Sequence, residues 1–284
     1  MSTDVVILLL IVDFSLGSSF EGKVIGGKYA TIKNFPHVAF LKINVDYEAY
    51  ICGSSVLNQL LLVSAAHCFE LIDKRTIIGV YAGHHDIFQV KLVRLVKTVY
   101  RHKSYHSETI ANDIALIKLK HALPFGEFIK RVILRPNIHK EVGILAGWGA
   151  TNSQMSEFDY KLKCVSQKLR SKDDCSRIGT LHKGMICAGS FNSNHSRPSN
   201  HRSQASATIS ASGAMKVDQT EVKYAPPGVI RGDSGSGLIG KDYQIVGIVS
   251  HLVTSYPAII VYTNVSHYYS WIHQKAAKIL CPIE

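Results

Sequence analysis

Short strand-like segments recur along much of the chain, and this pattern limits the fold more than any other feature of the sequence. Each segment is rich in Val, Ile, Leu or Tyr and is bounded by Gly, Asn, Asp or Ser, which favour turns. Evenly spaced short strands of this kind predict an all-β barrel or sandwich. The clearest examples are residues 37–44, 51–57, 76–81, 88–100, 114–119, 142–146, 161–169 and 244–249.

The length and composition fit a single folded unit with one helix near its end. The chain has 284 residues, of which 46% are hydrophobic, and all-β chains of this size often form one domain. Charged residues make up only 19%, which is typical of a globular protein. Residues 267–279 predict the helix, because apolar side chains recur there at helical spacing: Tyr268, Trp271, Ile272, Ala276 and Ile279.

A polar, Ser-rich stretch at residues 192–227 interrupts the strand pattern. A structureless segment of this length is unusual inside a compact domain, and where it occurs it is usually functional or disordered. We therefore expect an insert that lies outside the barrel. A translated intron would give the same composition, and the sequence alone leaves that alternative open.

An unbroken apolar run at residues 5–12 lies close to the N-terminus. It is too short to cross a bilayer, which needs about 20 residues, and its position favours a cleaved signal peptide over residues 1–17. The alternative is the N-terminal strand of a cytosolic protein. The 6 cysteines fit an oxidising compartment, where most would be paired. We therefore expect a secreted, extracellular protein that does not span a membrane.

The formal net charge of +11 would also suit a protein that binds nucleic acid or a membrane surface. However, Lys and Arg are distributed among strands and loops, without a basic helix or a nucleic-acid-binding motif. We interpret the charge as a basic, solvated surface and expect neither nucleic acid nor membrane as a partner. The 14 histidines show no spacing that would indicate a zinc site, so we predict no metal and no cofactor.

Three short segments carry the residue types that acyl transfer from an amide requires, namely a nucleophile, a base and a group that orients the base. Ser234 lies in GDSGSG, where glycines on both sides permit a tight turn. His67 follows an apolar strand in SAAHC, and Asp113 opens a strand in NDIAL. Taken alone, these residues would be a turn serine, a structural histidine and a capping aspartate. Together, in the order His, Asp, Ser, they favour catalysis.

From about residue 24 to its end, the chain resembles the chymotrypsin/trypsin-like serine proteases. The matching motifs, in the family order, are VIGG, SAAHC, NDIALIKL, AGWG, MICAG, GDSG and VYTNVS. The resemblance implies two six-stranded antiparallel β-barrels with a C-terminal α-helix, and a serine protease domain over residues 24–284. It also implies a monomeric serine endopeptidase whose partners are protein or peptide substrates and protease inhibitors.

The resemblance assigns each motif residue a role. His67 would act first as general base and then as general acid, Asp113 would orient it, and Ser234 would attack the carbonyl carbon. The backbone N–H groups of Gly232 and Ser234 would stabilise the oxyanion. Ser250 matches a buried serine that supports the aspartate.

The resemblance also implies that the protein is made as a zymogen. Family members are cut after a basic residue, and Lys23 precedes Val24 in the sequence KVIGG. Residues 18–23 would then be a short propeptide. The new Val24 ammonium would pair with Asp233, and this buried ion pair could order the oxyanion loop only after the cut.

Four of the cysteines match two disulfides of the family, Cys52–Cys68 and Cys175–Cys187. In the chain-entropy account, a disulfide that closes a loop of this size stabilises the folded state by about 3 kcal/mol. Cys164 and Cys281 have no family partner in this chain, and could be free, paired together or intermolecular.

The chain departs from the family at the primary specificity pocket. Gly228 stands at the base, where an acidic residue would select Lys or Arg, and Leu252 and Ile260 stand where two pocket walls are usually Gly. We therefore expect a shallow or plugged pocket that prefers small residues. A cysteine bridge near the pocket is also absent, because Ile230 replaces one partner, and His84 replaces an acidic calcium ligand. These departures keep open a second hypothesis, a catalytically weak or inactive homologue that acts as a binding protein.

Overall fold

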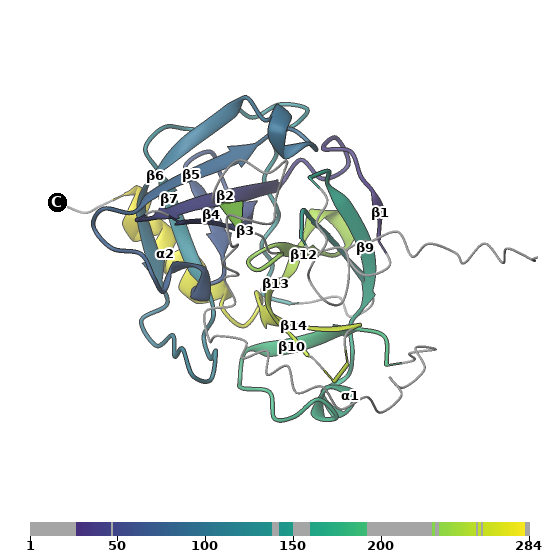
Figure 1. Ribbon diagram of the computed structural model, residues 1–284. Coiled ribbons are helices and arrows are strands. Elements are labelled where there is room, and N and C mark those ends of the chain that lie inside the picture. The colour runs from purple at the N-terminus through teal and green to yellow at the C-terminus, as the bar shows by residue number, and fades with distance from the viewer. Residues whose placement is uncertain are drawn as a thin grey trace, which may run out of the picture.

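The computed structural model describes residues 27–46, 48–137, 142–149, 160–191, 229–230, 233–253, 255–256 and 258–281. The predicted signal peptide, propeptide and insert lie outside the described residues. The described chain forms two curved β-sheets connected by turns and loops, and a helix near the C-terminus packs against one of them (Figure 1). The all-β class that the strand pattern predicted is confirmed.

The first sheet closes into a six-stranded antiparallel barrel. Its strands run in the order β3-β2-β5-β6-β7-β4, and pairing of β3 with β4 completes the ring. A short strand, β11 (Val229–Ile230), adds to β3 in the parallel direction, which the sequence did not predict. The barrel strands are β2 (Val38–Val45), β3 (Glu48–Val56), β4 (Leu61–Ser64), β5 (Ile77–Ala82), β6 (Leu92–Arg101) and β7 (Ala115–Leu119).

The second sheet has the order β1-β9-β8-β12-β13-β14-β10, and all its pairings are antiparallel. A single bridge between Leu169 and Ala188 links the end of β9 to β10, so that the sheet curls into a second, less complete barrel. Its strands are β1 (Lys28–Tyr29), β8 (Val142–Gly147), β9 (Lys163–Lys168), β10 (Met185–Gly189), β12 (Gly237–Ile239), β13 (Ile245–Leu252) and β14 (Ile259–Asn264).

The predicted helix is present as α2 (Tyr269–Leu280), and it packs on the first barrel rather than on the second. It buries Ile272 and Ile279 in the core of that barrel, and Lys118 of β7 donates to the carbonyl of Ile279. Figure 1 shows α2 beside β6 and β7. A shorter helix, α1 (Lys172–Ser176), lies between β9 and β10. No helix within the described ranges is both long enough and apolar enough to cross a bilayer.

The structure corrects the start of one predicted strand. The apolar segment 88–100 predicts a strand from residue 88, but β6 begins at Leu92. The carboxylate of Asp86 accepts a hydrogen bond from the backbone N–H of Phe88, and this cap stabilises a short 3₁₀ turn over Ile87–Gln89. Aspartate is a favoured capping residue, so a local hydrogen bond overrides the strand tendency of the apolar residues.

Candidate active site

His67 begins a short 3₁₀ turn, His67–Phe69, which is separated from the end of β4 by two residues. The apolar strand β4 is fully buried in the barrel, so the turn that follows it carries His67 into the interior, where only 2% of the residue is exposed. Its backbone N–H donates to Oδ1 of Asp113, and its ring Nδ1 lies 2.8 Å from Oδ2 of the same carboxylate. Two contacts with one carboxylate fix the orientation of the imidazole.

Asp113 lies just before β7, in a turn that its neighbours hold in place. Asn112 adopts a left-handed conformation with a φ of 57°, which Asn tolerates better than most residues. Its side chain donates to the carbonyl of Ser104 and accepts a hydrogen bond from the hydroxyl of Tyr268. The turn directs the Asp113 carboxylate inward, where only 1% of the residue is exposed.

The second sheet contributes two hydroxyl groups to Asp113. Ser250 of β13 donates a 2.6 Å hydrogen bond to Oδ2 of the carboxylate, and Thr263 of β14 donates a 2.6 Å bond to the backbone carbonyl. Both residues are buried. A buried carboxylate is costly unless it is paired and hydrogen-bonded, and here these requirements are met from both sheets.

The surroundings of His67 favour its protonated form. Burial by itself opposes the charged imidazolium, but the charge and hydrogen bond of Asp113, together with the charge of Glu70, outweigh it and raise the pKa of His67. An imidazole that gains a proton readily at this position is suited to act as a general base.

Ser234 lies in a tight turn that the first barrel and β13 anchor. Its carbonyl accepts a 2.7 Å hydrogen bond from the backbone N–H of Gly53, and the N–H of Gly235 donates to the carbonyl of Val249. Gly235 has a φ of 84°, and a Cβ there would lie 2.1 Å from the Ser64 hydroxyl oxygen. Only glycine fits this position, which explains the glycine after Ser234.

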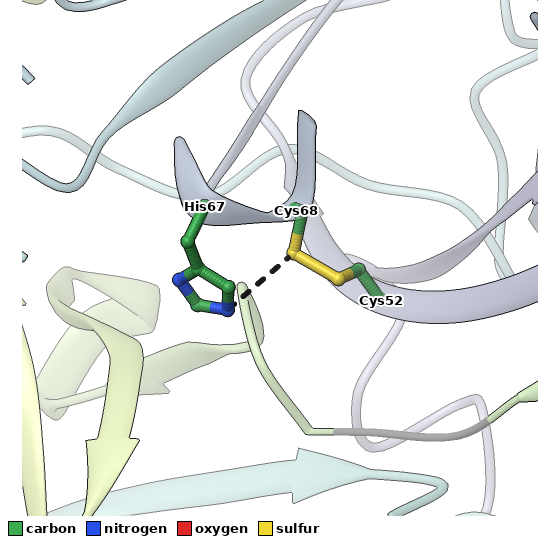
Figure 2. Close-up of side chains that lie close together, drawn as sticks. All are labelled: Cys52, His67 and Cys68. Carbon is green, nitrogen blue, oxygen red and sulfur yellow. Dashed lines mark hydrogen bonds between the residues drawn. A yellow bond between two sulfur atoms is a disulfide. The ribbon is translucent and has the colours of Figure 1, made fainter. Parts of the chain in front are cut away.

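The Cys52–Cys68 disulfide lies between His67 and Ser234. Cys68 Sγ is 3.9 Å from Nε2 of His67 and 3.8 Å from the carbonyl oxygen of Ser234. Figure 2 shows the imidazole ring turned toward this sulfur. The structure therefore brings Ser234 next to the His67–Asp113 pair, although the Ser234 hydroxyl forms no hydrogen bond with the imidazole in the described part of the chain.

This group of side chains is not a metal site. Cys52, His67 and Cys68 offer ligand atoms within 4.8 Å of one another, but the two sulfur atoms are joined at 2.02 Å. A disulfide sulfur is not a thiolate and cannot serve as the charged ligand that zinc requires. The second predicted disulfide, Cys175–Cys187, is also formed, whereas Cys164 and Cys281 are free thiols.

Asp233 occupies a slot lined by two glycines. The backbone N–H of Gly149 donates a 2.8 Å hydrogen bond to its Oδ1, and a Cβ on either Gly147 or Gly149 would lie 2.1 Å from a carboxylate oxygen. Although the residue as a whole is half-buried, its carboxyl group is enclosed. Desolvation raises the pKa of Asp233 to about 6, and the Gly149 hydrogen bond opposes the shift only in part. The slot holds a carboxyl that has no cationic partner among the described residues.

A match to one family model shows which proteins this chain is related to. The family model described as Trypsin matches residues 24–200, which is more than half of the chain. The chain belongs to the trypsin family.

Individual relatives of this trypsin-family protein have low sequence identity, but they align with most of its length. Duodenase-1 of Bos taurus is 29% identical over 278 residues, which cover 94% of this chain and 95% of its own. Trypsin-1 of Gadus morhua is 30% identical over 183 residues, which cover 61% of this chain and 72% of its own. HL collagenase has the same fold, with a TM-score of 0.67 at 21% identity, covering 89% of this chain and 98% of its own.

A further solved structure has the same fold. The scabies mite inactivated protease paralogue S-D1 matches with a TM-score of 0.67 at 19% identity, covering 89% of this chain and 97% of its own. At such identities the likeness establishes the fold alone.

In this trypsin-family chain, the two residues predicted to wall the specificity pocket face each other. Leu252 of β13 pairs with Ile260 of β14 across the sheet. Ile260 is 8% exposed and packs in an apolar cluster with Val249 and Tyr262, whereas Leu252 is 38% exposed. Ile260 is thus part of the apolar core of the second sheet, whereas Leu252 remains accessible to solvent.

Several predicted positions fall outside the described residues. Lys23, Val24, Gly228 and Gly232 are among them, so their predicted roles stay predictions. Thr263 was not predicted to have a role, although it lies within the VYTNVS motif and donates to the backbone of Asp113. The contribution of Glu70 to the pKa of His67 was not predicted either, because Glu70 belongs to no motif.

Proposed function

We propose that the protein is a serine endopeptidase that hydrolyses peptide bonds through His67, Asp113 and Ser234. The observation that carries the proposal is the buried Asp113 carboxylate, which holds the His67 ring at 2.8 Å and is itself held by Ser250. Ser234 lies beside this pair, across the Cys68 sulfur. Membership of the trypsin family supports the same chemistry.

In the proposed mechanism, the Ser234 hydroxyl attacks the carbonyl carbon of the substrate while Nε2 of His67 takes its proton. Asp113 keeps the proton of the neutral ring on Nδ1 and stabilises the imidazolium that forms. The imidazolium then protonates the leaving amine, and a water molecule, activated by the same ring, releases the acyl group. Backbone N–H groups of Gly232 and Ser234 would stabilise the negative oxygen of each tetrahedral intermediate.

We also propose that the chain is a zymogen cut after Lys23. The enclosed Asp233 carboxyl supports this proposal, because it lacks a cation among the described residues and its pKa is raised to about 6 by desolvation. A Val24 ammonium inserted beside it would supply that cation. The Ser234 turn follows Asp233 directly, so pairing there would order the oxyanion loop and bring the Ser234 hydroxyl within reach of His67.

The protein is further proposed to be secreted, extracellular and monomeric, with peptide or protein substrates and protease inhibitors as its partners. The apolar run at residues 5–12 and the two formed disulfides support an oxidising compartment. The position of Ile260, a buried apolar residue where the family usually has Gly, supports a preference for small residues before the cleaved bond, rather than trypsin-like selection of Lys or Arg.

Labelling with a fluorophosphonate tests the activity directly. This reagent bonds to a serine hydroxyl only when the surrounding groups activate it. The full-length protein should label after cleavage at Lys23 but not before, and mass spectrometry should locate the label on Ser234. Ser234→Ala should abolish labelling, whereas Ser236→Ala, which changes a neighbouring serine, should leave a labelled site at Ser234. Absence of any label on protein whose N-terminus is confirmed as Val24 would refute the proposal.

The second candidate function is that of a catalytically weak or inactive homologue that binds other proteins. The observation that favours it is the absence, in the described residues, of a hydrogen bond between the Ser234 hydroxyl and His67. The fold alone fits both candidates. The same labelling experiment separates them, because an inactive homologue would remain unlabelled after the cut.

A further inference from the structure

The turn between β14 and α2 carries an Asn-X-Ser sequence that has no part in the proposed catalysis. Asn264 is the last residue of β14, and Val265 and Ser266 follow it. An asparagine in such a sequence, with any residue but proline in the middle, is the acceptor of N-linked glycans in secreted proteins. Because the pattern is short enough to arise by chance, the geometry of the side chain must decide whether it can carry a glycan.

The side-chain oxygen of Asn264 holds this turn together. Oδ1 accepts hydrogen bonds from the backbone N–H of Ser266 at 3.1 Å, from the hydroxyl of Ser266 at 2.8 Å and from the backbone N–H of His267 at 3.4 Å. Backbone N–H groups can only donate, so they identify the atom that they contact as the amide oxygen. The oxygen and nitrogen lie on opposite sides of the amide carbon, and fixing Oδ1 in the turn therefore directs Nδ2 away from these donors.

The side-chain nitrogen of Asn264 is in contact with solvent. Nδ2 forms no hydrogen bond within the described part of the chain, yet it is not one of the buried side-chain atoms that lack a partner there. Asn264 is only partly buried, whereas the rest of β14 is buried. The one atom of this side chain to which a sugar can be attached is thus both unpaired and accessible.

The residues around Asn264 are polar and exposed. Its backbone N–H donates to the carbonyl of Gly184, in the turn before β10, and Figure 1 shows β10 and β14 side by side. That turn carries the exposed residues His182 and Lys183, and His267 beyond Asn264 is exposed as well. Neither turn contributes a large exposed apolar side chain. A hydrophilic glycan at this position would therefore extend into water without covering an apolar surface.

We propose that Asn264 carries an N-linked glycan, a proposal that rests on the proposed secretion. In the transfer, Nδ2 forms a bond to the anomeric carbon of the first sugar of a lipid-linked oligosaccharide. The bond from that carbon to the lipid diphosphate breaks, the lipid diphosphate leaves, and the amide nitrogen loses one proton. Oδ1 keeps its lone pairs, so the three hydrogen bonds of the folded turn are compatible with the modified side chain.

Expression of the full-length chain in cultured eukaryotic cells tests this proposal. The parent would carry Ser234→Ala, so that no sample digests itself, and Asn194→Gln, which removes the second Asn-X-Ser sequence of the chain. Protein secreted into the medium should lose mass on treatment with peptide N-glycosidase. This enzyme converts a glycosylated asparagine to aspartate, and mass spectrometry should locate the conversion at Asn264. Secreted protein with an unmodified Asn264 would overturn the proposal.

Matched variants separate the acceptor nitrogen from the turn that holds it. Asn264→Asp keeps an acceptor oxygen for the turn but removes Nδ2, and Ser266→Ala keeps the amide but destroys the sequence, so each should abolish the mass loss. Ser266→Thr keeps a hydroxyl at this position and should retain the mass loss in full. A mass loss that survives in Asn264→Asp would place the glycan elsewhere and overturn the proposal. Unfolding midpoints establish that each variant is folded.

A chain that stays inside the cells without a glycan would also overturn the proposal. The same parent with residues 1–17 replaced by the signal peptide of another secreted protein then shows which step fails. Modification behind this foreign signal would attribute the failure to the predicted signal peptide, whereas an unmodified Asn264 would attribute it to the site. None of these outcomes depends on the proposed protease activity, because every sample lacks the Ser234 hydroxyl.

Discussion

Ser250 donates a 2.6 Å hydrogen bond to Oδ2 of Asp113, the same carboxylate oxygen that lies 2.8 Å from Nδ1 of His67. Ser250 belongs to β13 of the second sheet, whereas Asp113 precedes β7 of the first barrel. The bond therefore joins the two halves of the molecule at the candidate active site. If the proposed mechanism holds, the alignment of His67 depends on contacts from both sheets.

The first prediction concerns these contacts. Asp113→Asn should lower kcat by about 10⁴-fold, because the amide favours the wrong tautomer of His67. Ser250→Ala leaves the carboxylate in place and removes one of its hydrogen bonds, so it should lower kcat by only about tenfold. A hydrogen bond to a charged group is worth roughly 1.5–3 kcal/mol, and only part of this energy would be lost from the transition state. Steady-state kinetics of the activated protein on a peptide substrate measure both effects. A Ser250→Ala loss as large as that of Asp113→Asn would contradict the assigned roles.

The second prediction concerns Asp233 and pH. Its pKa is raised from 3.8 to about 6, so between about pH 4 and pH 6 the folded uncut chain binds more protons than the unfolded chain. The free energy of unfolding should therefore fall as the pH rises through this range. Asp233→Asn removes the ionisation and should stabilise the uncut chain at pH 7 by up to about 3 kcal/mol, with little effect at pH 4.

Denaturant unfolding of both proteins at pH 4 and pH 7 provides the measurement for Asp233. Cleavage after Lys23 supplies the control, because a Val24 ammonium beside Asp233 would lower its pKa again. In the cut protein, Asp233→Asn should then destabilise rather than stabilise at pH 7. The same effect of the substitution before and after cleavage would argue against the predicted ion pair.

The third prediction concerns specificity. Overpacking by a few methylene groups costs about 1–3 kcal/mol, which corresponds to roughly 5- to 150-fold discrimination against large side chains. The activated protein should therefore prefer Gly, Ala or Ser before the cleaved bond. Leu252→Gly combined with Ile260→Gly should extend cleavage to larger apolar residues. A peptide-library profile of both proteins checks this, and strong cleavage after Lys or Arg by the unchanged protein would show that Leu252 and Ile260 do not set its specificity.

The fourth prediction concerns the disulfide beside His67. Changing Cys52 and Cys68 to Ala should lower the free energy of unfolding by about 3 kcal/mol and should also weaken fluorophosphonate labelling, because Cys68 packs between His67 and Ser234. Changing Cys175 and Cys187 to Ala should cost a similar amount of stability, about 2–4 kcal/mol, with a smaller loss of labelling. Equal effects on labelling would show that the position of the Cys52–Cys68 bridge is unimportant to the site.

Local sequence signals predicted strands β2, β3, β5 to β9 and β13, the C-terminal helix and the motifs that contain His67, Asp113 and Ser234, whereas β1, β10, β12 and β14 were not among the predicted segments. Alternation, turn residues and helical spacing are properties of neighbouring residues, so they can be read without a structure. The start of β6 was wrong because a single side-chain hydrogen bond from Asp86 competes with strand formation. The parallel addition of Val229–Ile230 to β3 was missed because a two-residue strand has no pattern of its own.

Contacts between distant residues could not be predicted in this way. Thr263 reaches the backbone of Asp113 across 150 positions of sequence, and nothing near either residue indicates the pairing. The basic residues of β6, β7 and α2 are likewise dispersed in the sequence and were interpreted as a general solvated surface. The fold places them together because α2, although distant in sequence, packs on the barrel that contains β6 and β7.

The packing of α2 on the first barrel has a consequence for biosynthesis. The helix is the last of the described elements, yet it buries Ile272 and Ile279 against a barrel whose final strand ends at Leu119. A ribosome-bound chain would therefore display the apolar surface of this barrel until α2 emerged, because the element that covers this surface is made long after the strands. Translation that stopped early, or a nick just before Tyr269, would leave the same surface open to quality-control chaperones and proteases even if every strand had paired.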